Sequence, residues 1–310
     1  MPDIVISEFM DQTAVDDLAR DYDVLYDPDL AQSSQRLEYA AARCRVLIVR
    51  NRTEVRAPLL DICVRLKVIG RLGVGLDNID LETCRARGIK VLPATGANDT
   101  AVAEYVIAGI LMLLRGAYHA HSPMISGEWP RNRLIGREIA GRTLGLIGFG
   151  RTARSVAERA RALGMSISAY DPHISRSDPS WELLHVEHCE FESLLAKSDA
   201  VSIHVPLNDE TRHLIDRSAL RRMKPSSILI NAARGGIVDE RALADALRHQ
   251  ALAGAMLDVY ESEPLAAANA FLNAPNLILT PHIAGVTLES NARVSAVTGA
   301  NVRRALQEMA

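Results

Sequence analysis

Short runs of aliphatic and β-branched residues alternate along the chain with stretches of helical periodicity. The first series contains DIVIS (3–7), VLIV (46–49), LKVIG (66–70) and IKVL (89–92), separated by helix-like stretches such as 13–20 and 81–87. A second series, of about six strands, contains TLGLIG (143–148), MSISAY (165–170), DAVSIHV (199–205), SSILINA (226–232), AGAMLDV (253–259) and NLILT (276–280). Such alternation predicts α/β architecture, with parallel sheets covered by helices on both faces.

The two series are separated by a long helical pattern over 100–117, which begins after Asn98–Asp99, a natural N-cap pair. The last helical pattern, 288–307, is followed by no strand, so we expect it to pack back on the first domain. We therefore predict a discontinuous domain of residues 1–98 plus 286–310, and a dinucleotide-binding domain of residues 99–285.

Composition and charge exclude several classes of protein. The 310 residues carry a net charge of −3, too close to neutral for a nucleic-acid or anionic-membrane surface. The N-terminal MPDIVISEFMD has no basic region, so it does not resemble a signal peptide, and the apolar run 105–114 is too short to span a bilayer. Four scattered cysteines without a CxxC pair favour a reduced, cytoplasmic protein.

His185, His188 and Cys189 are the one candidate metal cluster. No second group with ligand spacing accompanies them, and WELLHVEHCEFESLL is typical of a surface connection before a helix. We therefore expect no metal site.

The strand TLGLIG leads directly into GFGRTA and a helical pattern, which forms a G-x-G-x-x-A motif. Gly148 suits a tight turn, Gly150 allows backbone to approach a pyrophosphate, and Ala153 is a tolerated third position. Asp171 follows the next strand, where a carboxylate accepts hydrogen bonds from ribose hydroxyls and repels a 2′-phosphate. The motif predicts NAD as cofactor, while the nearby Arg176 leaves some use of NADP open.

Three later strand ends each carry one residue of catalytic type. INAARGG contains Arg234, LDVYESEP contains Glu263, and TPHIAG contains His282. The carboxyl ends of parallel strands share one sheet edge, where ligands of open α/β sheets bind. The three residues together therefore predict an active site.

LIVRNRT, residues 47–53, carries Arg50 and Arg52 two positions apart. In an extended chain this spacing directs both guanidinium groups to the same face, where they could bind an anion.

These motifs occur in the order found in D-isomer-specific 2-hydroxyacid dehydrogenases, which the chain resembles over essentially its whole length. GRLGVGLDNID (70–80), the GFGRTA turn, HVPLNDETRHLID, MKPSSILINAARGGIVDE, AGAMLDVYESEP and TPHIAG carry the resemblance. It implies two doubly wound parallel-sheet domains: a Rossmann NAD-binding domain and a flavodoxin-like substrate domain. It also implies a homodimer, with helix 100–117 and GEWPR (127–131) as interface elements.

The resemblance implies a role for each site residue. Arg234 would hold the substrate carboxylate and carbonyl oxygen, His282 would be the acid/base, and Glu263 would orient its ring and favour its protonated form. The backbone of Gly73, Val74 and Gly75 would bind the carboxylate. Residues expected to line the cofactor are Gly148, Gly150, Arg151, Thr152, Asp171, Val205, Ala232, Ala233, Arg234, Asp258, His282, Ile283, Ala284 and Gly285.

Arg50, Arg52 and Arg71 exceed what a simple 2-hydroxy acid needs, so they indicate a second anion on C3. ISEFMD, RNRT, RLGVGLDNID, PATGAND, GEWPR and HIAGVTLESN are most similar to the short (S)-sulfolactate dehydrogenases within the family. We expect NAD-linked interconversion of (S)-3-sulfolactate and 3-sulfopyruvate. D-3-Phosphoglycerate or another D-2-hydroxy acid is the alternative substrate, and a non-catalytic NADH-sensing protein is an alternative of another class.

Overall fold

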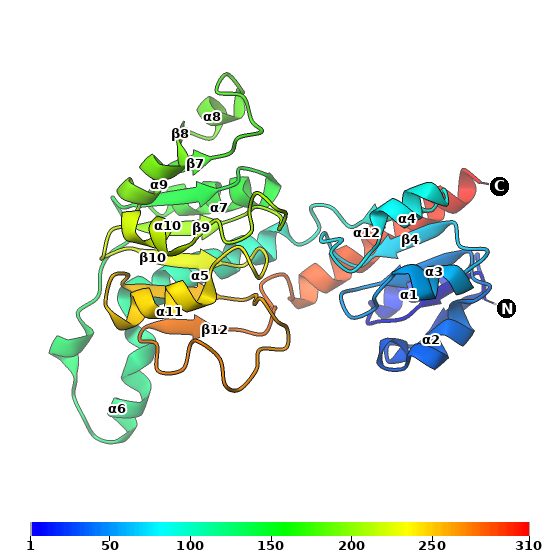
Figure 1. Cartoon of the computed structure of the whole chain (residues 1–310), viewed down its shortest axis with the longest axis horizontal. Helices are drawn as coiled ribbons and strands as arrows, with labels where there is room; N and C mark the ends of the chain where they lie inside the picture. The colour runs from blue at the N-terminus through cyan, green and yellow to red at the C-terminus, as the bar shows by residue number, and fades with distance from the viewer. Residues whose placement is uncertain (1, 310) are drawn as a thin grey trace. The chain divides into compact units, whose positions relative to one another are not determined.

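The computed structural model describes residues 2–309. The chain forms two compact units, Met1–Asn98 with Val286–Ala310 and Asp99–Gly285, which are described separately below (Figure 1). Every strand pairing within the two sheets is parallel, as the alternating pattern predicts. Both strand orders match known doubly wound folds, so the predicted fold class is confirmed.

The discontinuous unit contains a five-stranded sheet in the order β2-β1-β3-β4-β5, the flavodoxin-like order. Its strands are β1 (Ile4–Ile6), β2 (Val24–Tyr26), β3 (Val46–Val49), β4 (Val68–Arg71) and β5 (Lys90–Pro93). Its helices are α1 (Gln12–Ala19), η1 (Leu30–Gln32), α2 (Ser34–Ala41), α3 (Ala57–Ile62), α4 (Leu81–Ala86) and α12 (Leu288–Gln307).

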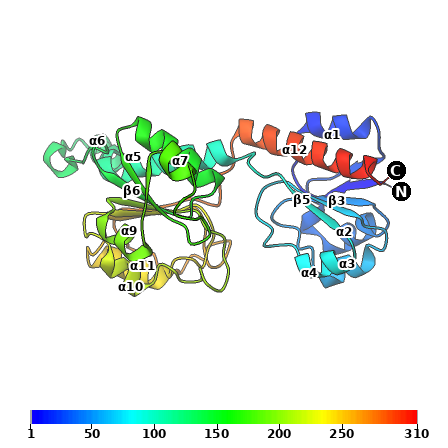
Figure 2. The same cartoon turned by 90° about the horizontal axis from the view of Figure 1, so that it is seen from above.

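Helix α12 returns the chain to this unit. The Thr287 side chain accepts a hydrogen bond from the Ser290 backbone N–H at 3.0 Å and so caps the helix N-terminus. The helix packs on α1 and β4 and, with α1, covers one face of the sheet, opposite α2, α3 and α4 (Figure 2). The prediction that the C-terminal helix packs against the first sheet is confirmed.

The continuous unit contains a seven-stranded sheet in the order β12-β11-β10-β9-β6-β7-β8, a Rossmann order with one added strand. Its strands are β6 (Thr143–Ile147), β7 (Ser166–Tyr170), β8 (Val186–His188), β9 (Ala200–Ile203), β10 (Ile228–Asn231), β11 (Gly254–Leu257) and β12 (Leu277–Leu279). Its helices are α5 (Asp99–Arg115), η2 (Ala117–Ala120), α6 (His121–Ile125), η3 (Arg131–Leu134), α7 (Arg151–Ala162), α8 (Ser180–Leu183), α9 (Phe191–Lys197), α10 (Arg217–Arg222) and α11 (Glu240–Arg248). Helices α5 and α7 lie on one face of the sheet and α9, α10 and α11 on the other (Figure 2).

Two short strands, β2 and β8, were not predicted from the hydrophobic pattern. The interpretation of residues 181–195 as a surface connection is wrong in part, because β8 lies within it and pairs with Ile167–Ala169 of β7. The sheet therefore has seven strands instead of about six. Strand β2 pairs with β1 at the edge of the other sheet. Each is only three residues long and lies at a sheet edge, where pairing with its one neighbour defines the strand.

Helix α5 ends at Arg115 because Gly116 adopts a left-handed conformation, with φ 59°. The following segment, residues 117–135, forms an arm that extends away from the sheet of its own unit (Figure 1). Within residues 2–309 no single helix meets the length and hydropathy needed to cross a membrane. Helix α5 meets them only when joined to Ala117–Ile125 across a bend of 57°.

Candidate active site

The turn after β6 has the conformation that a dinucleotide requires. Gly148 has φ +88°, and a Cβ there would lie 2.7 Å from the His204 carbonyl oxygen, so no side chain fits. A Cβ on Gly150 would meet nothing within 4 Å, which leaves open space at the N-terminus of α7. Ala153 is fully buried against the sheet. The open position beside unpaired helix N–H groups fits a pyrophosphate.

Asp99, at the start of α5, holds the two residues that follow Gly150. Its carboxylate accepts hydrogen bonds from Thr152 Oγ1 at 2.7 Å and from Arg151 Nε at 3.2 Å. The start of α7 is therefore fixed by α5, against which the helix packs. The sequence analysis did not assign this role to Asp99.

Asp171, directly after β7, is fixed beside the same turn. One carboxylate oxygen accepts the Phe149 N–H and the other accepts the His173 N–H, both at 2.9 Å. Asp171 therefore lies where its charge faces the turn. Arg176, the residue that leaves NADP use open, is exposed and forms an ion pair with Glu190.

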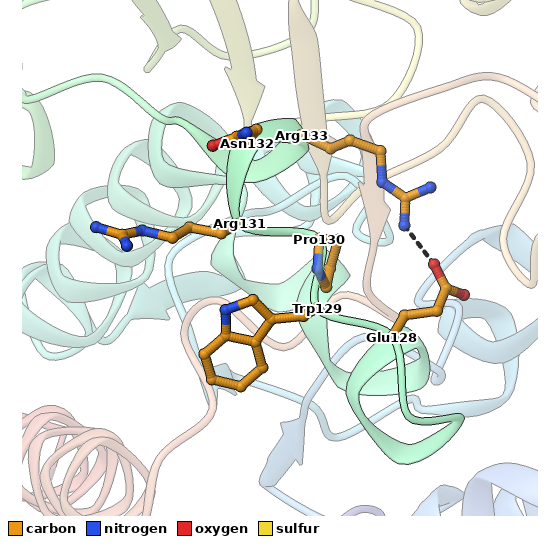
Figure 3. A pocket seen from close by; sticks show the side chains of 6 residues that line it. All are labelled: Glu128, Trp129, Pro130, Arg131, Asn132 and Arg133. Atoms are coloured by element: carbon orange, nitrogen blue, oxygen red, sulfur yellow. Dashed lines mark hydrogen bonds and ion pairs between the residues drawn. The ribbon is translucent and has the colours of Figure 1, made fainter.

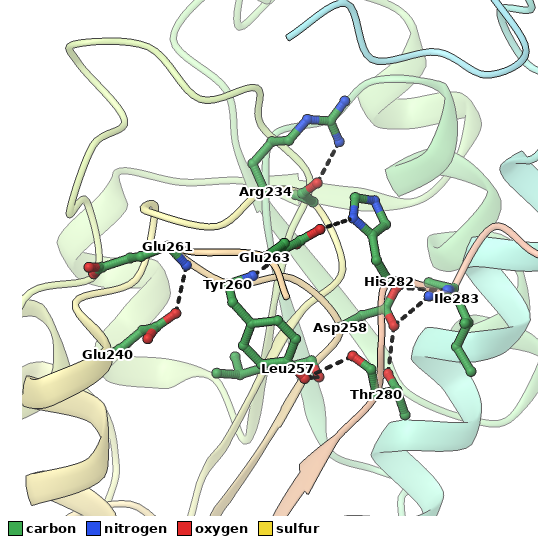
Figure 4. Close-up of polar contacts among 12 residues, drawn as sticks. Arg234, Glu240, Leu257, Asp258, Tyr260, Glu261, Glu263, Thr280, His282 and Ile283 are labelled. Atoms are coloured by element: carbon green, nitrogen blue, oxygen red, sulfur yellow. Dashed lines mark hydrogen bonds and ion pairs between the residues drawn. The ribbon is translucent and has the colours of Figure 1, made fainter. Parts of the chain in front are cut away.

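Arg234, Glu263 and His282 follow β10, β11 and β12 and belong to one group of polar contacts (Figure 4). His282 Nδ1 lies 2.8 Å from Glu263 Oε2, as the resemblance implies. The other oxygen of Glu263 accepts the Tyr260 N–H at 3.1 Å. An imidazole that is held through Nδ1 presents Nε2 for proton transfer.

The pKa of Glu263 is lowered in the folded protein. Burial alone would raise it, but the hydrogen bond and charge of His282, the Tyr260 N–H and the charge of Arg234 outweigh burial. The carboxylate form is therefore retained beside the imidazole, where it can stabilise an imidazolium.

A hydrogen-bond network around Asp258 fixes the backbone conformation at His282. Buried Asp258 accepts hydrogen bonds from Thr280 Oγ1 at 2.6 Å, Ile283 N at 2.8 Å and Ala284 N at 2.7 Å. Thr280 Oγ1 also lies 2.5 Å from the hydroxyl of Tyr105 on α5. His282 has φ 55°, a conformation that costs free energy in a residue with a side chain. The network holds the ring-bearing residue in that conformation.

The loop after β10 is fixed by Asn231, whose role the sequence analysis missed. Its side chain accepts the Ala233 N–H at 3.0 Å and donates to the Arg234 carbonyl at 2.9 Å. Close packing also matters, since a Cβ on Gly235 would lie 1.7 Å from the Tyr260 carbonyl oxygen. The first glycine in ARGG, Gly235, was the available signal, because such a close approach admits no other residue.

The predicted cofactor residues all follow strands of the seven-stranded sheet, at its carboxyl edge. Val205 follows β9 and would contact any Cβ on Gly148 at 2.9 Å. Ala232 follows β10, while Ile283, Ala284 and Gly285 follow β12. The structure thus brings these residues to the carboxyl edge of the sheet, where ligands of open α/β sheets bind.

The segment after β3 differs from the extended chain assumed for Arg50 and Arg52. Residues 51–53 form a bend, so the two-residue spacing does not fix a common face for the guanidinium groups. Arg50 is half-buried and donates to Asn291 Oδ1 at 2.9 Å, whereas Arg52 is exposed. Among residues 2–309, no ion pair includes either arginine. The premise of an extended chain was wrong, because the buried carboxylate of Glu8 draws the backbone N–H groups of this turn toward itself.

Arg71, at the end of β4, supports the loop that contains Gly73, Val74 and Gly75. It is 9% exposed and donates from Nε to Gly75 O and from Nη1 to Leu72 O, both at 2.7 Å. A Cβ on Gly73, which has φ +146°, would lie 2.5 Å from Arg71 Nη1. The guanidinium group therefore lies directly under the loop and shapes it.

A pocket of about 680 Å³ lies elsewhere, on the arm, and contains none of these residues. It is lined by Glu128, Trp129, Pro130, Arg131, Asn132 and Arg133 (Figure 3). Arg133 forms an ion pair with Glu128 at 2.6 Å, and the Trp129 side chain is 77% exposed. This hollow is a surface feature of the arm and carries no catalytic group.

Two members of the candidate metal cluster that the sequence analysis set aside have other surroundings. His188 contacts Trp181 edge to face, and Cys189 is buried. In the part of the chain that the structure describes, no three His, Cys, Asp or Glu side chains are arranged to hold a metal ion.

Comparisons with known proteins agree with this site. Residues 107–284 match the family described as D-isomer specific 2-hydroxyacid dehydrogenase, NAD binding domain. The chain is 56% identical over 307 residues to the (S)-sulfolactate dehydrogenase of Chromohalobacter salexigens, covering 99% of each chain. It is 37% identical to the D-3-phosphoglycerate dehydrogenase of Archaeoglobus fulgidus, covering 96% of this chain but only 56% of that one.

A solved structure extends the similarity to the fold. The D-lactate dehydrogenase of Aquifex aeolicus, complexed with NAD and lactic acid, superposes with a TM-score of 0.86 at 29% identity, covering 98% of this chain and 95% of that one. The resemblance found in the sequence is thereby confirmed. The chain belongs to the D-isomer-specific 2-hydroxyacid dehydrogenases and is an NAD-binding oxidoreductase.

Proposed function

We propose that the enzyme interconverts (S)-3-sulfolactate and 3-sulfopyruvate by NAD-linked hydride transfer at C2. The observation that carries this proposal is the 56% identity, over 99% of both chains, to a protein named for that activity. Arg50 and Arg52 provide a chemical reason, because a guanidinium group binds a sulfonate through paired N–H···O bonds much as it binds a phosphate.

The seven-stranded unit supplies the proton chemistry. In the oxidation direction, His282 Nε2 accepts the C2 hydroxyl proton while Glu263 stabilises the imidazolium that forms. Arg234 binds the substrate carboxylate and the developing carbonyl oxygen. Bound NAD would supply the hydride acceptor for C2. The reverse reaction uses the same groups, with His282 as the acid.

We assign substrate binding to the discontinuous unit, residues 1–98 plus 286–310. The backbone N–H groups of Gly73, Val74 and Gly75 bind the substrate carboxylate, in a loop whose shape depends on Arg71. Arg50 and Arg52 bind the C3 sulfonate, and Arg71 adds positive charge next to them. (S)-Sulfolactate has the spatial arrangement of the D-hydroxy acids, because sulfur raises the priority of its CH₂ arm above that of the carboxyl group.

We also propose that Asp171 gives a preference for NAD over NADP, since its fixed carboxylate would repel a 2′-phosphate. We propose that the residues predicted to line the cofactor bind NAD. All four cysteines are free and buried, which supports a reduced, cytoplasmic location.

A homodimer is the assembly we propose. The arm, residues 117–135, exposes large apolar side chains: Met124 at 44%, Ile125 at 75%, Trp129 at 77% and Ile135 at 80%. Apolar side chains gathered on one projecting segment are typical of an interface. Analytical ultracentrifugation of the wild-type protein and of Trp129→Ser tests this assembly.

The function is tested by following NAD reduction with (S)-sulfolactate, (R)-sulfolactate, 3-phosphoglycerate and D-lactate. We expect the highest kcat/KM with (S)-sulfolactate and a poor rate with the R isomer. A higher value with 3-phosphoglycerate would establish the alternative function, which the similarity to phosphoglycerate dehydrogenases supports. NADH binding without turnover of any 2-hydroxy acid would indicate a sensing protein.

A further inference from the structure

Residues 50–53, which we call the arginine turn, are built around a buried carboxylate. Glu8, just after β1, is 4% exposed. It accepts hydrogen bonds from the backbone N–H groups of Arg50 at 2.8 Å, Arg52 at 3.0 Å and Thr53 at 3.0 Å. A carboxylate that accepts several N–H bonds is well solvated by the protein.

The remaining polar groups of the turn are also fixed. Asn78 donates to the carbonyl oxygens of Arg50 at 3.0 Å and Thr53 at 2.6 Å, and the Thr53 hydroxyl lies 2.8 Å from that of Ser7. Asn291 accepts from the Arg50 guanidinium. Glu8 and Asn78 thus preorganise the backbone and Asn291 holds the Arg50 side chain, while the Arg52 side chain remains exposed.

Glu8 also changes the charge of this site. Burial lowers the pKa of Arg50, and the negative charge of Glu8 opposes that effect, so the two charges interact. The other side chains that contact the turn, Ser7, Asn78 and Asn291, are neutral. Glu54, the acidic residue that follows the turn, is exposed and forms an ion pair with Arg56. Glu8 therefore offsets one of the three positive charges that Arg50, Arg52 and Arg71 provide.

The two candidate substrates differ in the charge of the C3 group. A sulfonate carries a single negative charge across the working pH range. A phosphate monoester is doubly charged above its second pKa of about 6. Tetrahedral shape and oxygen acceptors are similar in both, so arginines alone discriminate weakly between them.

We propose that Glu8 determines specificity: its buried negative charge makes the arginine turn select a singly charged sulfonate over a doubly charged phosphate. This inference rests on the proposed function, because it requires Arg50 and Arg52 to bind the C3 anion. Glu8 acts through charge and through the position of the turn, and it does not contact the reacting atoms.

The first test uses the wild-type enzyme. The KM for (S)-sulfolactate and the competitive inhibition constant of 3-phosphoglycerate are measured at pH 7.5 and pH 5.5. The singly charged phosphate rises from about 3% to about three-quarters of the total over this range. We expect the ratio of inhibition constant to KM to fall at least fivefold at the lower pH. Protein groups that affect both ligands equally cancel in this ratio.

The second test is Glu8→Gln, which removes the charge and keeps a similar shape. At pH 7.5 we expect 3-phosphoglycerate to gain about tenfold in affinity relative to sulfolactate, equivalent to about 1.4 kcal/mol. The control is Asp61→Asn, which removes an equal charge from an exposed ion pair with Arg87 in the same unit. The control should leave the ratio unchanged. Thermal unfolding of each variant is recorded to check that it folds. If Glu8→Gln does not fold, the wild-type pH series tests the role of Glu8.

The outcomes separate this inference from the proposed function. If the enzyme turns over sulfolactate but the ratio of inhibition constant to KM changes neither with pH nor in Glu8→Gln, the role of Glu8 is overturned. The proposed function then remains intact. The same holds if 3-phosphoglycerate fails to inhibit under every condition. A wild-type enzyme that oxidises 3-phosphoglycerate better than sulfolactate at pH 7.5 overturns both.

Discussion

The carboxyl edge of the seven-stranded sheet and the arginine turn of the five-stranded unit are organised in different ways. At the sheet edge, a side chain holds the catalytic ring: Glu263 bonds to His282, while Asp258 binds both the Thr280 hydroxyl and the backbone N–H groups of Ile283 and Ala284. At the turn, the side chains of Glu8 and Asn78 bind backbone. Proton transfer needs a ring in one orientation, whereas anion recognition needs a fixed backbone from which a charged side chain extends.

This difference predicts two kinds of mutational effect. Changes at the sheet edge should lower turnover of every substrate, because all of them use the same proton transfer. Changes at the turn should affect only substrates that carry a C3 anion. The predictions below follow from that contrast, in order of decreasing effect.

The largest effect is expected for His282→Ala, which removes the acid/base. Because general acid–base catalysis contributes about 10²- to 10⁴-fold, kcat should fall by at least that range for all substrates. NADH binding, measured by fluorescence titration, should be nearly unchanged. His213→Ala is the matched control, since His213 forms a comparable exposed pair with Glu261 at 3.1 Å. Near-normal activity in His282→Ala would refute the assignment.

Arg52→Ala should affect one class of substrate only. Loss of a charged hydrogen-bond partner costs about 1.5–3 kcal/mol, so kcat/KM for sulfolactate should fall roughly 10- to 100-fold. The slow rate with D-lactate should barely change. Arg56→Ala removes an equal charge from an exposed pair with Glu54 and should leave both rates intact. An equal loss with both substrates would mean that Arg52 supports the fold and not the substrate.

Glu263→Gln should lower kcat about five- to tenfold, since a neutral hydrogen bond to His282 replaces a charged one. It should also move the pH–rate profile, because the imidazolium loses its counter-charge. A drop in rate at constant profile would indicate that Glu263 only orients the ring.

The same variant has a pH signature in stability. The pKa of Glu263 is lowered on folding, so the pair stabilises the protein above the ordinary carboxyl pKa, and this contribution is lost as pH falls through the folded-state value. Thermal unfolding should therefore show a smaller loss of stability as the pH falls below about 4.5 in Glu263→Gln than in the wild type. Parallel curves for the two proteins would contradict this.

The smallest effect is expected for Asp171→Ser. Removing a carboxylate beside the dinucleotide turn should raise activity with NADP relative to NAD several-fold, measured as the ratio of kcat/KM values. Asp178→Asn removes a charge from the exposed segment that follows and serves as control. A wild-type enzyme that prefers NADP would exclude this role for Asp171 and point to Arg176, despite its ion pair with Glu190.

The sequence by itself determined the fold class, the family and the residues at the sheet edge. Long buried strands such as β6 and β10 appear as apolar runs, because both of their faces are covered. Gly148, Arg234, Glu263 and His282 lie directly after such runs or in the loops that follow them, so a local pattern is enough to locate them. Parallel pairing then brings them to one edge.

The tertiary structure alone decided features that depend on contacts between distant residues. Strands β2 and β8 lie at sheet edges, and each is held by backbone pairing with a single neighbour, β1 or β7. The conformation of residues 50–53 is set by Glu8 and Asn78, which lie 42 and 28 residues from Arg50 along the chain. A local pattern carries no information about such partners. A buried carboxylate that must find N–H donors bends the chain more strongly than the weak extended preference of a few exposed residues holds it straight.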